Sequence, residues 1–139
     1  PLGKPVEFRW FVDDDHAGDK LTRRSRTGIL IYINGAPIVW HTKKQNTVET
    51  STFGSEFVAL KVATEILRGL RYKLRMMGIP IAGPSYIYCN NNSVVINSSS
   101  PASTLKKKSN SIAYHCVRES VAADRRARAA AGRACSHRI

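Results

Sequence analysis

The apolar residues of this chain change period once, near residue 50, and that change limits the fold more than any other feature. Residues 6–12 alternate between apolar and polar side chains, which is typical of a strand with one buried face. From Phe53 to Met77 the apolar side chains recur every three or four residues, which predicts a long amphipathic helix. Gly78, with Pro80 just beyond it, marks the expected end of that helix. A chain with both patterns has to bury a helix against a sheet.

Two further strands are predicted around a tight turn. The apolar runs 29–33 and 38–40 flank Asn34-Gly35, a pair that tolerates the positive φ angles of a two-residue hairpin. A short strand, a short helix and a longer helix are then expected at residues 86–89, directly after Asn90 and at residues 112–121. This order predicts an α/β domain whose mixed central sheet opens with three antiparallel strands and is flanked by helices.

The charge balance indicates a polyanionic partner. The chain holds 22 Lys and Arg against 10 Asp and Glu, a formal net charge of +12. Such an excess favours nucleic acid, with an anionic membrane surface as the rival partner. No stretch approaches the roughly 18 apolar residues of a spanning helix, and no signal peptide is recognisable. The three cysteines form no CxxC pair, so free thiols in an intracellular compartment, cytoplasmic or nuclear and not secreted, are expected.

Acidic residues stand at two unusual positions. Glu56 falls on the apolar stripe of the predicted helix, where a carboxylate has to be paired, hydrated or bound to a cation. A first-turn Glu stabilised by the helix dipole, by about 0.3–1 kcal/mol, is the alternative. Asp13, Asp14 and Asp15 close the first strand, with Asp13 and Asp15 on one side and Asp14 on the other. A solvated turn would also explain them.

Taken together, these acids indicate a metal site. The first strand, the helix and the strand that ends at Asn90 would bring Asp13 and Glu56 to one point. Grouped carboxylates suit hard cations such as Mg²⁺. Two such ions, about 4 Å apart, can clamp a phosphodiester for attack by water.

The chain resembles the ribonuclease H domain of copia-type retrotransposon polyproteins. The matching stretches are residues 12–19, 23–28, 40–45, 56–60, 78–80, 87–93 and 114–119. In order and spacing the resemblance covers residues 3–122 and implies a ribonuclease H-like fold. Residues 123–139 are expected to form an Ala/Arg-rich tail, outside the domain or disordered.

The resemblance implies Mg²⁺-dependent cleavage of the RNA strand in RNA–DNA hybrids during reverse transcription. By position, it places the catalytic residues at Asp13, Glu56 and Asn90, and the ligands of two Mg²⁺ ions at Asp13, Glu56 and Asp15. The family has Asp where this chain has Asn90. The two acids that match the family supply a charge of −2 against the +4 of two ions, so impaired cleavage is expected.

Basic residues in loops are the expected nucleic-acid contacts: Arg23, Arg24, Lys43, Lys44, Lys107 and Lys108. The expected partners are an RNA–DNA hybrid or other nucleic acid, and the reverse transcriptase and integrase regions of a parent polyprotein, with no membrane. Whether the chain is an enzyme is left open. The rival hypotheses are a working nuclease that draws on Asp14 or Asp15, a non-catalytic nucleic-acid-binding remnant, and a functionless relic.

Overall fold

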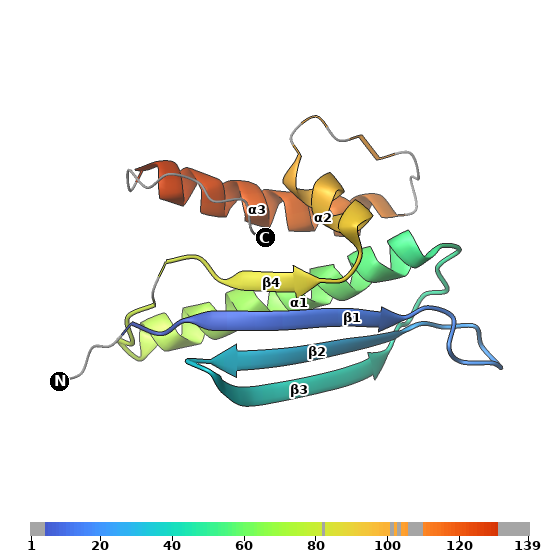
Figure 1. Ribbon diagram of the computed structural model, residues 1–139, viewed down its shortest axis with the longest axis horizontal. Helices are drawn as coiled ribbons and strands as arrows, with labels where there is room; N and C mark the ends of the chain where they lie inside the picture. The colour runs from blue at the N-terminus through green and yellow to red at the C-terminus, as the bar shows by residue number, and fades with distance from the viewer. Residues whose placement is uncertain (1–4, 82, 101, 103, 106–109, 131–139) are drawn as a thin grey trace.

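The computed structural model describes residues 5–81, 83–100, 102, 104–105 and 110–130, which form one sheet and three helices (Figure 1). The elements are β1 (Phe8–Asp15), β2 (Arg26–Ile33), β3 (Ala36–Lys44), α1 (Thr52–Met76), β4 (Tyr86–Cys89), α2 (Asn92–Ser99) and α3 (Ser111–Ala130). The predicted order of strands and helices is confirmed.

The four strands lie in the order β3-β2-β1-β4. β2 runs antiparallel to both β1 and β3, whereas β4 runs parallel to β1. Asn34 and Gly35 form the turn between β2 and β3 with φ angles of 49° and 87°, as their sequence predicts. The sheet is therefore mixed and opens with three antiparallel strands, which confirms the predicted fold class.

α1 covers one face of the sheet. Ser51 caps its first turn by accepting a hydrogen bond from the Gly54 N–H at 3.3 Å. The apolar stripe of α1 packs on a sheet face that includes Trp10 and Ile31, both 0% exposed. Burial of each such side chain stabilises the fold by about 1.5–3 kcal/mol. Figure 1 shows α1 crossing behind the strands, with α2 and α3 beyond β4.

A second apolar cluster joins the three helices. Phe57 of α1, Val94 of α2 and Tyr114 and Val117 of α3 are buried together. α3 continues to Ala130, nine residues past the helix end expected at residue 121. Residues 123–130, expected as the start of a tail, are thus helical, while residues 131–139 lie outside the described part. The domain boundary at residue 122 stays a prediction.

Within the described residues, no helix is both long enough and apolar enough to cross a membrane.

Candidate functional site

The parallel pairing of β1 with β4 brings two of the predicted site residues together. Asp13 lies near the end of β1, and Asn90 follows β4 directly. The register pairs Val12 with Cys89, so the next residue of each strand lies at the same edge of the sheet. The Asn90 Nδ2 donates a hydrogen bond to the Asp13 Oδ1 at 3.0 Å. These residues are 77 positions apart in sequence.

Glu56 lies behind this pair, on the helix side of the sheet. Its side chain is buried, and the Cys89 thiol lies within weak hydrogen-bonding distance of the Glu56 Oε2, at 3.5 Å. Burial raises the pKa of Glu56, and the negative charges of Asp14 and Asp13 raise it further. Burial also raises the pKa of the Cys89 thiol to about 11, so that it is neutral and poorly nucleophilic near pH 7.

Asp14 points to the inner side of the sheet, opposite to its neighbours, as strand alternation predicts. The Gln45 Nε2 donates to the Asp14 Oδ1 at 3.1 Å and lies 3.0 Å from the Thr27 Oγ1. Burial raises the pKa of Asp14, while a hydrogen bond from Ser55 lowers it in part. The Ser55 hydroxyl also contacts the His16 Nδ1 at 3.1 Å.

This polar network was missed by the sequence analysis. Gln45 and Ser55 are buried at 5% and 0% exposure. A polar residue that follows a strand, and another in the first turn of a helix, normally face solvent. Only the buried hydrogen bonds of the folded chain assign them a role beside the acids.

A basic hollow adjoins the site where β1 ends and β2 begins. It has a volume of about 290 Å³. Its lining residues are Asp15, Gly18, Asp19, Lys20, Arg24, Arg26 and Lys44. Four cations thus face two acids. Asp15, a predicted metal ligand, lies in this hollow, and its role as a ligand stays a prediction.

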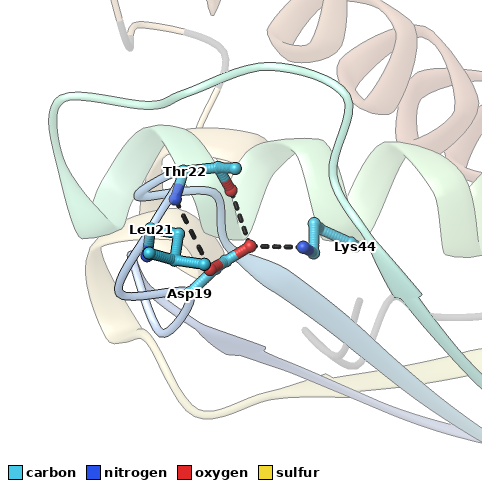
Figure 2. Close-up of polar contacts among 4 residues, drawn as sticks. All are labelled: Asp19, Leu21, Thr22 and Lys44. Carbon is cyan, nitrogen blue, oxygen red and sulfur yellow. Dashed lines mark hydrogen bonds and ion pairs between the residues drawn. The ribbon is translucent and has the colours of Figure 1, made fainter.

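Asp19 organises one wall of the hollow (Figure 2). Its carboxylate accepts hydrogen bonds from the Thr22 hydroxyl at 2.6 Å and the Leu21 N–H at 3.1 Å, and it pairs with Lys44. Lys44, followed by Thr22, holds the pKa of Asp19 well below its usual range. Because Asp19 engages Lys44, the other three cations carry most of the hollow's surplus charge.

The predicted nucleic-acid contacts are distributed around the hollow. Arg24 and Lys44 line it, Arg23 is exposed on the same loop, and Lys43 is exposed on β3. Lys107 and Lys108 lie outside the described residues. Lys20 and Arg26 complete the hollow and were not among the predicted contacts.

The donor set does not fit two magnesium ions. Within the described ranges, no group of three or more His, Cys, Asp or Glu side chains is arranged to hold a metal. The Asp13 carboxylate already accepts the amide N–H of Asn90, a donor that carries no negative charge. Glu56, with its raised pKa, is the second acid. Asp13 and Glu56 alone cannot balance two divalent ions.

Comparisons with known proteins relate most of the chain to transposon polyproteins. No protein-family model matches the chain. It is 30% identical over 119 residues to the retrovirus-related Pol polyprotein from transposon TNT 1-94 of Nicotiana tabacum, and 29% identical over 119 residues to that from transposon RE1 of Arabidopsis thaliana. Each match covers 86% of this chain, but the chain spans only 9% and 8% of the two polyproteins.

A shorter match links the chain to a different kind of protein. Over 55 residues it is 44% identical to secreted RxLR effector protein 161 of Plasmopara viticola, covering 40% of this chain and 39% of that protein.

Among solved structures, the chain resembles LC11-RNase H1, a protein isolated from compost by a metagenomic approach. The TM-score is 0.53 at 16% sequence identity, and the match covers 89% of this chain and 76% of that one. At this identity the likeness shows the fold alone.

Proposed function

Because this chain is a homologue of copia-type Pol polyproteins over most of its length and has a ribonuclease H-like fold, we propose that it is a retrotransposon ribonuclease H domain with an impaired nuclease centre. Its ancestral reaction is Mg²⁺-dependent hydrolysis of RNA in RNA–DNA hybrids. In this proposal the chain retains the surface for nucleic acid and has lost most of the cleavage.

The hydrogen bond between Asn90 and Asp13 carries the proposal. A carboxylate at position 90 would repel Asp13 unless a cation lay between them. The amide instead satisfies Asp13 directly at 3.0 Å and removes the electrostatic need for a cation. If the lost charge costs about 4 kcal/mol at the transition state, the cleavage rate falls about a thousandfold.

The decisive experiment restores the acid. Release of labelled RNA from an RNA–DNA hybrid is measured with and without Mg²⁺ for the wild type and Asn90→Asp. We expect negligible cleavage by the wild type and a gain of at least about a hundredfold for Asn90→Asp, in Mg²⁺ only.

Two controls define what would contradict this outcome. Asn97→Asp adds the same charge on α2, seven residues beyond Asn90, and should leave the wild-type rate unchanged. Rapid cleavage by the wild type that disappears in Asp13→Asn would show a working nuclease. In that case Asp14 or Asp15 would be the source of the missing charge.

The basic hollow favours a second candidate function, non-catalytic binding of nucleic acid. Its four cations lie beside the end of β1, and the whole chain has a net charge of +12. Phosphate contacts of this kind need no metal. Hybrid binding that persists in EDTA, without cleavage by either the wild type or Asn90→Asp, would favour this function over the first.

The proposed function also implies a ligand and neighbouring regions for the domain. An RNA–DNA hybrid would be its ligand, and the reverse transcriptase and integrase regions of a parent polyprotein would be its neighbours in an intracellular compartment.

A further inference from the structure

The sheet has an open face, opposite the face that α1 covers. Among the described residues, no helix packs on this open face, and Figure 1 shows the strands lying in front of α1. The odd-numbered side chains of β1 point to this open face. The residues that pair with them on β2 and β4 point to the same face. Strand registers align one row of side chains across the whole sheet: Trp40, Leu30, Phe11 and Tyr88.

The three rings of this aromatic row are exposed to an unusual degree. Trp40 is 79% exposed, Phe11 45% and Tyr88 38%. Phe11 stacks on Tyr88 with ring centroids 5.1 Å apart and meets Tyr32 edge-on at 5.8 Å. An exposed apolar strip on a sheet is typical of an interaction surface rather than of a solvated one.

Cations lie on both sides of the aromatic row. Arg26 and Lys44 are cross-strand neighbours; Arg26 lies four residues before Leu30 in β2, and Lys44 lies four residues after Trp40 in β3. At about 3.3 Å per residue, this puts them roughly 13 Å from the row, on the same face. Arg9 lies on that face on the row's other side, two residues before Phe11, where it pairs with Glu7 at 3.2 Å.

We propose that the open face binds single-stranded nucleic acid, with bases stacked on the aromatic row and phosphates held by Arg26. Aromatic side chains on an open four-stranded sheet offer flat surfaces to unpaired bases. A duplex hides those base faces within its own stack. Binding of a single strand here requires no cleavage and does not depend on Asn90, although Asp13, two residues from Phe11, points to the same face.

Charge favours nucleic acid over a second copy of the chain as the occupant. Two copies that met through this face would bring together two chains of net charge +12. A single strand adds a negative charge with every nucleotide and would offset the positive net charge of the chain.

The two tryptophans allow a direct test. Trp10 is 0% exposed in the core, whereas Trp40 is 79% exposed, so a ligand on the open face affects the fluorescence of Trp40 alone. Oligo-uridylate of 12 residues is titrated into the full chain. We expect fluorescence quenching by the single strand. Trp40→Ala should lose that quenching and bind the strand about tenfold more weakly, the loss expected for one stacked base.

Matched variants separate stacking from general damage. Tyr72→Ala removes a ring that is 65% exposed on α1 and should leave the affinity unchanged. Trp40→Phe keeps a ring at the row and should retain most of the affinity. Thermal unfolding of each variant confirms that the chain is folded.

Three outcomes would overturn the proposal. One is equal affinity of Trp40→Ala and the wild type for the oligonucleotide. Another is tighter binding of a duplex than of the single strand, with no effect of Trp40. The third is a dimer in sedimentation that Trp40→Ala dissociates without changing nucleic-acid affinity. None of these outcomes alters the hybrid-cleavage experiment, so the two proposals fail independently.

Discussion

At Glu56, burial and neighbouring charge act in the same direction. Both raise its pKa, so the folded chain holds the proton of this carboxyl more tightly than the unfolded chain does. Because the folded state binds more protons between the ordinary and the raised pKa, stability falls as the pH rises through that window. The ionised form therefore costs folding free energy near pH 7, and the cost disappears below the ordinary value of 4.5.

We predict that Glu56→Gln stabilises the chain near pH 7, by a free energy of unfolding of about 1 kcal/mol. The gain should shrink as the pH is lowered to about 4, where Glu56 is protonated. Urea unfolding at both pH values measures the difference. Glu65→Gln is the control, because Glu65 is exposed and paired with Lys61 at 3.4 Å; it should change stability by less than about 0.5 kcal/mol. A less stable Glu56→Gln at pH 7 would contradict the prediction.

The sequence predicted the exceptional position of Glu56 because helical spacing alone puts it on the apolar stripe. It also predicted that Asp13 and Asp14 point to opposite sides of the sheet. It could not predict the bond from Asn90 to Asp13, or the burial of Gln45 beside Asp14. These contacts join residues far apart in sequence, so only the packed fold determines their distances.

Among the elements, α1 and the β2–β3 turn each contain an exposed glycine, with opposite backbone requirements. Gly69 lies within α1 with open space at its missing Cβ. Gly35 also has open space, but its φ angle is 87°, a conformation that disfavours L side chains. The same substitution should therefore have opposite effects at the two positions.

We predict that Gly69→Ala raises the free energy of unfolding by about 0.5–1 kcal/mol, because alanine loses less conformational entropy in a helix. Gly35→Ala should lower it by about 1 kcal/mol or more, through strain at the positive φ angle. Thermal or urea unfolding of the two variants and the wild type measures both changes in stability. Equal shifts of the same sign would show that the turn does not require its left-handed conformation.

The elements were predictable to the extent that their apolar patterns repeat. The alternation in β1, the hairpin turn and the stripe of α1 are strong local signals, and the structure confirms each of them. α3 was predicted too short, ending at residue 121 rather than Ala130. Beyond Val121 the sequence is rich in Ala and Arg and has no apolar face. Helix propensity, which is high for both residues, was the only signal there.

For the whole molecule, the net charge of +12 and the basic hollow predict salt-sensitive binding of an RNA–DNA hybrid. Each phosphate contact should add about −0.9 to the slope of log affinity against log salt concentration. Arg24→Gln, in the hollow, should reduce the slope by about one contact. Arg68→Gln, on the exposed side of α1, is the control and should leave it unchanged. Affinity that is independent of salt would contradict the prediction.

The parallel pairing of β1 with β4 also determines when the candidate site can form. Antiparallel β1 and β2 close a short loop, and so do β2 and β3, whereas β4 can join β1 only after the chain through α1 has been arranged. The Asn90–Asp13 contact closes a span of 77 residues, and such long-range contacts cost more chain entropy than local hairpins do. We therefore expect the site to assemble late in folding; on a ribosome it cannot form until residue 90 has left the exit tunnel.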